Sequence, residues 1–545
     1  MQIYTIFSQC EDCAPMFSVG GIFDFRNYLL PLCLICYGGI YFVTEKRLPT
    51  MSENKIYGAM DAATVKRFKH WQLRTIVVSM IGYAVYYFVR KNFSLAMPGL
   101  TAEYGISNTS FGIVIGIGSL VYGLSRFVNG FVVDKISTRT VMAIGLLLCA
   151  AANVAFGCGY DLSYAITGVA EGPQVVNMLI LLMGITIILN QYFQGFGYPP
   201  CARMLPHWIH PSELATKMSI WNTSHSIGAA AAVVVCGYIM GHLGMDLSAN
   251  AEVVARMAEN MGVATDDAEG MKRVLEYASH YGAWKWCFWI PAAVAVAGAV
   301  WLYVGLRDTP SSVGLPELPD TDTKSQEAAA DKRGHKKFIS HMVFKNRWIW
   351  TLCVANVFVY IMRMGILDWG PKFLTESRGM SIVSAAWSVA IFEIFAIIGT
   401  IFAGWATDKI FKSKAHHMCL VCMVMASLFM IIFVAFPQMP PVLSVLVLAM
   451  GGFFIYGPQA LIGIAAANQA TKEGSATANG VAGVFGYVGS FFSALGVGML
   501  ADAYGWNTVF YVIVAVGALG AIAFATMWKA PRDGYERAKQ IKYEE

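Results

Sequence analysis

Long uncharged apolar runs recur along the chain from about residue 75 to residue 528, separated by short polar segments. A helix needs about 20 consecutive apolar residues to cross the hydrocarbon core of a bilayer. The pattern therefore predicts an all-α membrane protein. Twelve transmembrane helices are predicted, at about 75–98, 110–133, 140–158, 176–203, 218–242, 284–306, 348–373, 382–406, 417–436, 441–466, 476–501 and 507–528.

The two halves of this body look like copies of one another. Arg90 and Arg363 each lie in a predicted membrane span, the first and the seventh, and are 273 positions apart. The motif G-x-x-x-D-K occurs as Gly130…Asp134-Lys135 and again 274 positions later as Gly404…Asp408-Lys409. Such an internal repeat predicts two pseudo-symmetric six-helix halves, with a ligand site at the midplane between them.

Polar segments divide the chain further. A charged, proline-containing linker at 307–347 separates an N-terminal half at 72–306 from a C-terminal half at 348–530. The N-terminal half carries a polar insertion at 245–281, in which Ala251–Met261 and Ala268–Ala278 have the periodicity of short amphipathic helices. Residues 531–545 form a polar tail. Residues 1–71 form an N-terminal extension whose apolar run 28–43 fits an extra span, a signal-like segment or an upstream mis-started reading frame.

Composition supports the membrane assignment and suggests an orientation. Only 13% of residues are charged, and the mean hydropathy is +0.54, whereas soluble domains have about 25% charged residues. Lysine and arginine gather in the loops after even-numbered spans, which predicts that both ends of the twelve-helix body are cytoplasmic. We expect a multi-pass protein of the cell inner (plasma) membrane, monomeric in the lipid bilayer. The net charge of +5 reflects this distribution of lysine and arginine among the loops. The sequence shows no clustered basic surface on a soluble domain of the kind that would bind nucleic acid.

The cysteines give little support to a metal site. Cys10-x-x-Cys13 and Cys33-x-x-Cys36 match a zinc-ribbon spacing. The second pair, however, lies inside the apolar run 28–43, where a soluble zinc site is not expected. The sequence also lacks a nucleophile–base cluster. We therefore expect no metal, no cofactor and no catalytic residues.

The first span has a polar stripe. Tyr83, Tyr86, Tyr87 and Arg90 are spaced i, i+3, i+4 and i+7, which predicts that they share one helix face. Tyrosine hydroxyls and a guanidinium group suit an oxyanion ligand. Alternatively, Arg90 extends to a lipid head group. The matched Arg363 favours a ligand, because a charge inside a membrane marks a functional site by default.

Further polar side chains interrupt the second and fifth spans. Tyr122 and Arg126 form an i, i+4 pair, and Arg126 fits either a ligand role or snorkelling to the cytoplasmic interface. Asn222 and His225 share a face of the fifth span with Trp221. We expect His225 to contact a ligand, because it is the titratable group in the middle of that span.

The second half adds carboxylates that need partners. Glu393 is the sole charge in Gly379–Thr407, and Asp368 follows Arg363 by five residues. An unpaired carboxylate in hydrocarbon costs several kcal/mol or becomes protonated. We expect Glu393 to pair with Lys91 or Arg126, so Lys91, Asp368 and Glu393 are candidates for gating charge pairs. Tyr456 and Tyr487 add hydroxyl groups in the tenth and eleventh spans.

Several motifs resemble one known family. They are Gly82-Tyr-Ala-Val-Tyr-Tyr-Phe-Val-Arg-Lys-Asn-Phe93, Gln194-Gly-Phe-Gly-Tyr-Pro-Pro-Cys201, Trp221-Asn-Thr-Ser-His225, Arg307-Asp-Thr-Pro310, Arg363-Met-Gly-Ile-Leu-Asp-Trp369 and Ile455-Tyr-Gly-Pro458. The resemblance is to the organophosphate:phosphate antiporters of the major facilitator superfamily, closest to bacterial glycerol-3-phosphate transporters, and covers about residues 72–535.

This resemblance implies roles for individual residues. Arg90 and Arg363 would grip phosphate, and His225 would contribute the histidine of the fifth span. The aromatic and acidic positions of the family correspond to Tyr83, Tyr87, Tyr122, Asp368, Glu393, Tyr456 and Tyr487. There are three departures from the pattern. Arg126 replaces a lysine, Tyr198 replaces a tryptophan, and Ser490 and Ala494 stand where hexose-phosphate members carry an acid–base pair.

The resemblance therefore implies exchange of an organophosphate for inorganic phosphate, and the third departure favours glycerol-3-phosphate as the organophosphate. A hexose-6-phosphate or phosphoglycerate antiporter and a membrane sugar-phosphate sensor of the same fold are alternatives. A proton symporter for neutral solutes is disfavoured, because we find no titratable carboxylate in a span of the first half.

Overall fold

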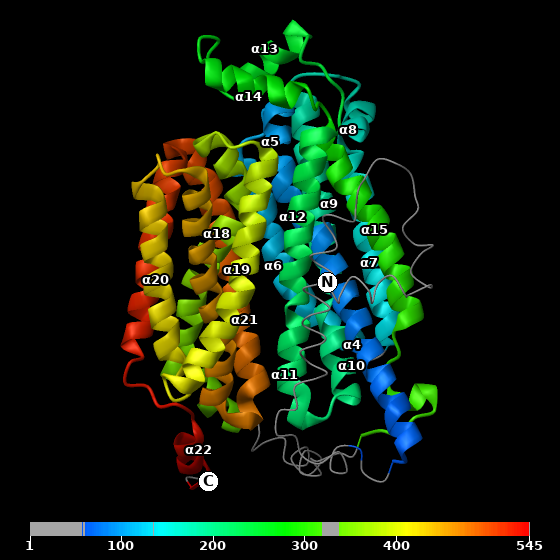
Figure 1. Ribbon diagram of the computed structural model, residues 1–545, viewed down its shortest axis with the longest axis vertical. Coiled ribbons are helices and arrows are strands. Elements are labelled where there is room, and N and C mark those ends of the chain that lie inside the picture. Colours follow the sequence, from blue (N-terminus) through cyan, green and yellow to red (C-terminus); the bar gives the residue numbers. More distant parts are fainter. Residues whose placement is uncertain (1–56, 58–59, 134–135, 319–336, 544–545) are drawn as a thin grey trace, which may run out of the picture. The chain divides into compact units, whose positions relative to one another are not determined.

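A computed structural model of the protein describes residues 57, 60–133, 136–318 and 337–543. Outside this part lie the apolar run 28–43, both cysteine pairs, the Asp134-Lys135 end of the first motif, residues 319–336 of the linker and the last two residues of the tail. The described residues are helical, with one isolated β-bridge between Met245 and Tyr281 (Figure 1). The expectation of an all-α membrane protein is thus confirmed.

Eleven helical segments of the described residues are long and apolar enough to cross a membrane. The last of them, Thr477–Thr526, has 50 residues, and a straight helix of that length would extend about 75 Å, far beyond a core of about 30 Å. Gly505 interrupts it with φ 76° and ψ 171°, a left-handed conformation that suits glycine. The segment therefore contains both of the last two predicted spans, which makes twelve.

The first half is built from broken helices. Its elements are α4 (Ala62–Lys91), α5 (Phe93–Tyr104), α6 (Asn108–Val133), α7 (Thr138–Gly157), α8 (Gly159–Thr167), α9 (Pro173–Gln194), α10 (Tyr198–Trp208), α11 (Pro211–Asn222), α12 (Ser224–His242) and α15 (Ala283–Gly305). Asn92, between α4 and α5, is buried and donates from Nδ2 to Asn153 Oδ1 at 2.7 Å and to the Cys287 carbonyl at 2.9 Å. These bonds fix the helix break that follows Lys91, one residue after Arg90.

The second half has longer helices. They are α18 (Arg347–Arg378), α19 (Ile382–Lys409), α20 (Ala415–Ala435), α21 (Pro441–Thr526) and the short α22 (Tyr535–Tyr543). Helix α21 contains three spans, because Thr471 and Gly505 both have non-helical backbone angles. Against the first half, α12 packs on α19 and α6 packs on α21. A methyl group at Gly112 would lie 2.5 Å from the Ala494 carbonyl oxygen, so this contact requires a small residue.

The insertion forms two helices, α13 (Ala251–Asn260) and α14 (Ala268–Ala278), which confirms the two amphipathic segments expected there. They lie at the end of the bundle that also carries α5, at the top of Figure 1. Arg273 on α14 donates to the carbonyl oxygens of Thr375 at 3.4 Å and Glu376 at 3.0 Å, at the end of α18. The insertion therefore belongs to the first half in sequence and also contacts the second half.

Polar contacts join the two halves at this insertion end. The Asp502 carboxylate accepts hydrogen bonds from the backbone N–H groups of Asn108 at 3.1 Å and Thr109 at 2.7 Å. The ammonium group of Lys372 donates to Thr101 Oγ1 at 2.6 Å. Since α4 runs toward this end (Figure 1), Lys91 and α5 lie beyond Arg90 on the same side. The halves are thus in contact on one side of the arginines.

Candidate functional site

Arg90 lies in the last turn of α4 and is enclosed by aromatic rings. Its guanidinium carbon lies 3.8 Å from the ring centroid of Tyr122 and 5.3 Å from that of Tyr87. The positive charge is attracted by the faces of both rings. Arg90 therefore points into the protein rather than toward a lipid head group, as a ligand-binding arginine requires.

Arg363 occupies the matching place on α18 and is more deeply buried. Its side chain is only 4% exposed, and its guanidinium carbon lies 4.4 Å from the ring centroid of Tyr456. Its Nε has no hydrogen-bond partner among the described residues. A donor left over on a buried guanidinium group is available to an incoming acceptor.

The two arginines face a common region. Both Arg90 and Arg363 act electrostatically on Tyr87 and on His225. The His225 ring lies 5.3 Å from the Tyr87 ring, and its Nδ1 is hydrogen-bonded to the Asn222 carbonyl oxygen. Because a carbonyl can only accept, Nδ1 carries the proton, and Nε2 is left to face other groups such as Ser226 Oγ at 3.4 Å. The Asn222 side chain itself is exposed.

Arg126 also points inward and does not snorkel. Its guanidinium group donates to the Tyr487 hydroxyl at 2.7 Å and lies 4.4 Å from the ring centroid of Tyr198. Tyr487, on α21, packs edge-on against Tyr122 with ring centroids 5.2 Å apart. Arg126 and Tyr122 therefore join the first half to the second at the level of Arg90.

The carboxylates are paired differently from our expectation for Glu393. Lys91 forms an ion pair with Asp368 across the two halves. Glu393, 1% exposed, instead accepts a hydrogen bond from Tyr456 of its own half. The expected pairing of Glu393 with Lys91 or Arg126 is therefore wrong for this conformation, because both basic groups already have partners on other elements.

The site has an excess of positive charge. Among the described residues, no carboxylate lies within ion-pair distance of the guanidinium groups of Arg90, Arg126 or Arg363. Guanidinium groups remain charged even when buried. Three such charges inside the bilayer, with Glu393 as a single carboxylate near Arg363 and with aromatic faces and hydroxyls around the others, favour an anionic ligand.

The tyrosine stripe of the first span is split. Tyr83 stacks on Trp221 with ring centroids 4.8 Å apart and packs edge-on against Tyr87. Tyr86, in contrast, is fully buried and donates to the Met142 carbonyl on α7 at 2.7 Å. The prediction that all four side chains share one face is wrong for Tyr86, which serves packing within the first half.

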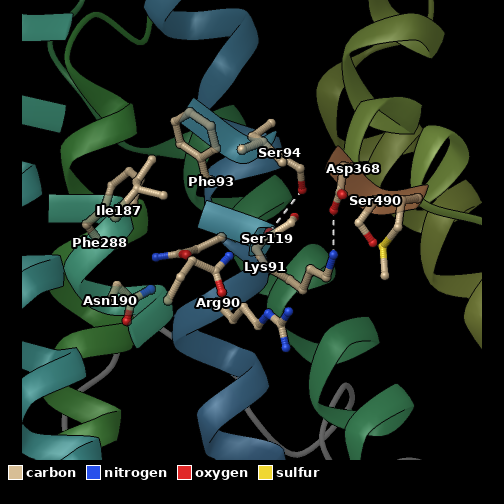
Figure 2. Close-up of a pocket in the computed structure, with 14 residues that line it drawn as sticks. Arg90, Lys91, Phe93, Ser94, Ser119, Ile187, Asn190, Phe288, Asp368 and Ser490 are labelled. Atoms are coloured by element: carbon tan, nitrogen blue, oxygen red, sulfur yellow. Dashed lines mark hydrogen bonds and ion pairs between the residues drawn. The ribbon is translucent and has the colours of Figure 1, made fainter. Parts of the chain in front are cut away.

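Six polar residues beside Arg90 were not among the predicted site residues. A cavity of about 50 Å³ is lined by Arg90, Lys91 and Asp368 together with these six, Asn92, Ser94, Ser119, Asn190, Gln191 and Ser490 (Figure 2). Ser490 was noted only as a departure from a family pattern. Serine and amide side chains are common in membrane helices, so their types alone give no signal. In the described ranges, no group of three or more His, Cys, Asp or Glu side chains is placed to hold a metal ion.

Comparisons with known proteins agree with this architecture. The family profile described as Major Facilitator Superfamily matches residues 79–494. A protein of Bacillus subtilis (strain 168) named glycerol-3-phosphate transporter is 33% identical, with 86% of this chain and 94% of that protein aligned. A probable hexose phosphate transport protein of Chlamydia pneumoniae is 31% identical, covering 85% of this chain and 93% of that one.

Similarity in structure extends beyond these relatives. The crystal structure of a bacterial homologue of the human lysosomal transporter Spinster, in an inward-facing and unoccupied conformation, superposes with a TM-score of 0.64. The identity is 15%, and the match covers 84% of this chain and 96% of that one. At this identity the likeness concerns the fold alone.

Proposed function

The chain belongs to the major facilitator superfamily, and we propose that it is a secondary transporter that exchanges an organophosphate for inorganic phosphate by alternating access. The relatives it matches are named as transporters of glycerol-3-phosphate and hexose phosphate, not as enzymes. The observation that supports the proposal is that Arg90 and Arg363, one from each half, both lie near Tyr87 and His225. Among the described residues neither arginine forms an ion pair with a carboxylate, and Glu393, the acid near Arg363, is hydrogen-bonded to Tyr456. A phosphoryl group is the part that all these substrates share.

The chemistry of the two arginines fits a phosphate ligand. A guanidinium group presents a planar fork of donors that matches phosphate oxygens bidentately. With one arginine on each half, a bound phosphate dianion makes bonds to both and draws them together. His225 and Tyr87 lie beside both charges and can complete the ring of hydrogen bonds, with Asn222, Tyr83, Tyr122 and Arg126 around it.

The same charges explain why transport is proposed to be an exchange. Closing the two halves around Arg90 and Arg363 without a ligand brings two unpaired positive charges together away from water. A penalty of about 4 kcal/mol would slow the return step roughly a thousandfold. A phosphate dianion neutralises both charges, and the halves can then rock around the site.

The choice of organophosphate rests on one difference in sequence. Ser490 and Ala494 occur where hexose-phosphate members of the resembling family carry an acid–base pair, so glycerol-3-phosphate is the proposed substrate. Hexose-6-phosphate, phosphoglycerate and a sugar-phosphate sensor are the alternatives. We further propose that both ends of the twelve-helix body are cytoplasmic, on the basis of the lysine and arginine distribution.

The proposal is tested by exchange in proteoliposomes. Purified protein is reconstituted with internal phosphate, and uptake of labelled phosphate is measured in competition with a panel of phosphorylated metabolites. We expect exchange of phosphate for phosphate, inhibited most strongly by glycerol-3-phosphate. A protein that binds the metabolites but does not exchange phosphate would be a sensor, and uptake without internal phosphate would refute obligatory exchange.

Substitution of the two arginines gives the sharpest prediction. Arg90→Lys and Arg363→Lys keep the charge and lose the bidentate fork, so each is expected to reduce exchange at least tenfold while the protein still inserts. Arg74→Lys is the matched control, because Arg74 lies on the same helix α4 and donates to the Gly305 carbonyl at 3.2 Å, away from the site. Near-normal exchange by both lysine variants would show that Arg90 and Arg363 do not bind phosphate through bidentate contacts.

A further inference from the structure

The insertion between α12 and α15 is fastened to the first half at both of its ends. These ends pair with each other, because the backbone N–H of Met245 donates to the Tyr281 carbonyl at 2.9 Å and the N–H of Tyr281 donates to the Met245 carbonyl at 3.0 Å. The buried Glu103 carboxylate of α5 accepts hydrogen bonds from the Gly282 N–H at 2.7 Å and from Trp284 Nε1 at 3.0 Å. The base of the insertion is therefore held against α5.

The two helices of the insertion also share a small hydrophobic core with α5. Five buried residues of α13, α14 and α5 form this core: Met257, Ala258, Val274, Ala278 and Ala102. Asn260, at the end of α13, donates from Nδ2 to the Ala102 carbonyl at 3.0 Å. Removing apolar surface from water stabilises such a contact. We therefore expect the insertion to move with the first half as one body.

A different row of side chains on α14 meets the second half. Glu269, Arg273 and Tyr277 are each four residues apart, so they share one side of the helix. A Cβ atom at Gly379, which ends α18, would lie 3.2 Å from Glu269 Oε1. Tyr277 lies next to the Thr375 side chain in the last turn of α18. Arg273 lies between these two contacts.

Arg273 caps the end of α18 from the other half. Its Nη1 donates to the Thr375 carbonyl at 3.4 Å and to the Glu376 carbonyl at 3.0 Å. Both belong to the last four carbonyl groups of the helix, which have no partner within it, and a cation is favoured at a helix C-terminus. The Glu376 carboxylate is engaged within its own half by Lys372 at 2.6 Å and Trp506 at 2.8 Å. Backbone carbonyls cannot follow Arg273 by changing rotamer, so these bonds break when the end of α18 moves away.

We propose that the insertion is a latch, in which α14 holds the end of α18 through Arg273 and stabilises the conformation that is closed at this end of the bundle. This inference rests on the rocking of the two halves in the proposed function and does not depend on which phosphate ester is carried. The anchors of the insertion on α5 all belong to the first half. When the halves separate at this end, the insertion therefore stays with α5, and α18 leaves Arg273.

The latch joins the two helical segments that carry the candidate site. Arg363 lies on α18, twelve residues before Thr375, which is about 18 Å along the helix axis. Arg90 lies in the last turn of α4, and α5 begins three residues later at Phe93 (Figure 1). A ligand that draws Arg90 and Arg363 together therefore acts on segments whose far ends are joined through Arg273. Without a ligand, the latch influences how often this end of the bundle opens.

Arg273→Gln is expected to favour the conformation that is open at this end. In the closed conformation the substitution removes the hydrogen bonds from a charged donor to the carbonyls of Thr375 and Glu376, whereas in the open conformation neither bond exists. The ratio of open to closed conformers should rise at least tenfold. Arg256→Gln is the matched control, because Arg256 lies on α13 and forms its ion pair with Glu171 of the first half. This pair is exposed and does not join the halves, so its loss should leave the ratio within about twofold of wild type.

Distances between pairs of spin labels in the purified full-length chain test the latch without requiring transport. The first pair, at Ser107 beside α6 and Tyr504 on α21, has one exposed position on each half and reports opening at this end. The second pair, at Glu259 on α13 and Tyr164 on α8, reports whether the insertion stays on the first half. In Arg273→Gln we expect a longer distance to gain population in the first pair and no change in the second pair. An unchanged second pair also shows that the insertion is still folded.

The outcomes separate the latch from the proposed function. An unchanged distance between Ser107 and Tyr504 in Arg273→Gln would overturn the latch, even if phosphate exchange is normal. A change confined to the second pair would also overturn it, because Arg273 would then hold the insertion in place and not the two halves together. An equally large shift in Arg256→Gln would indicate general loosening of the insertion and would overturn it too. The expected shift in a protein that does not exchange phosphate would support the latch and refute only the transport function.

Discussion

The ion pair between Lys91 and Asp368 is expected to stabilise one conformation of the transporter. Lys91 belongs to α4 and Asp368 to α18, and their side chains are 8% and 15% exposed. Exposed ion pairs contribute about 0–1 kcal/mol, but this pair is buried, so the energetics of buried charges apply. Removing one partner of a buried pair costs about 3–5 kcal/mol, because the other charge is left unpaired.

Asp368→Asn should therefore shift the balance between conformations. The pair connects the halves on the side where Asp502 also meets Asn108, so its loss destabilises the state in which this end is closed. A change of about 3 kcal/mol corresponds to roughly 150-fold in the conformational equilibrium. The double variant Lys91→Gln/Asp368→Asn leaves no unpaired charge and should lie closer to wild type.

Distances between spin labels can measure this shift. Ser107 and Tyr504 are exposed and lie at the insertion end of α6 and α21, one on each half. Labels at these positions should give one short distance in the wild type and a second, longer one in Asp368→Asn. Asp161→Asn is the control, because Asp161 pairs with Lys285 at 3.4 Å within the first half and is 61% exposed. If Asp368→Asn lowers the melting temperature without a longer distance, the pair supports the fold in every state and does not gate it.

Two further predictions concern the carboxyl group of Glu393 and the hydroxyl group of Tyr86. Glu393→Gln should leave the phosphate dissociation constant within about threefold of wild type, or tighter, because the acid beside Arg363 repels phosphate. It should slow exchange at least tenfold, because the acid takes part in rearranging the charges during the cycle. Loss of binding with normal turnover would contradict this. Tyr86→Phe should lower stability by about 0.5–1.5 kcal/mol, because it removes a buried hydrogen bond to the Met142 carbonyl, which keeps its bond within α7. It should not change substrate affinity. A thermal melt and a binding titration check both parts.

The helices could be predicted because a helix that crosses the bilayer requires a long apolar sequence. Every span needs about 20 apolar residues, and that requirement is visible in the pattern without knowledge of contacts. The break at Gly505 was also visible as a polar gap between the last two predicted spans. The faces of the helices were harder to predict. Tyr83 and Tyr86 lie only about 60° apart around the helix axis, so periodicity alone places them on one face, yet the Tyr86 hydroxyl bonds to α7 while Tyr83 stacks on Trp221.

The pairing of charges could not be read from the sequence. A lone Glu393 in an apolar span shows that a partner is needed, but each basic group of the other spans is a candidate. The structure gives Glu393 a tyrosine of its own half and gives Lys91 to Asp368. Which basic group or hydroxyl lies close to each carboxylate depends on how the two halves are rotated against each other. They are therefore expected to differ between the conformations of the transport cycle.

Unsatisfied buried polar atoms illustrate a limit of a different kind. Serine, asparagine and glutamine in a membrane helix most often bond to nearby backbone, as Ser427 does with the Met423 carbonyl at 2.8 Å. Their residue types therefore do not distinguish a ligand contact from a local bond. What distinguishes Asn190 is that its amide nitrogen is engaged by Val89 while its oxygen is left over. That difference exists only in three dimensions, and the residue type gives no sign of it.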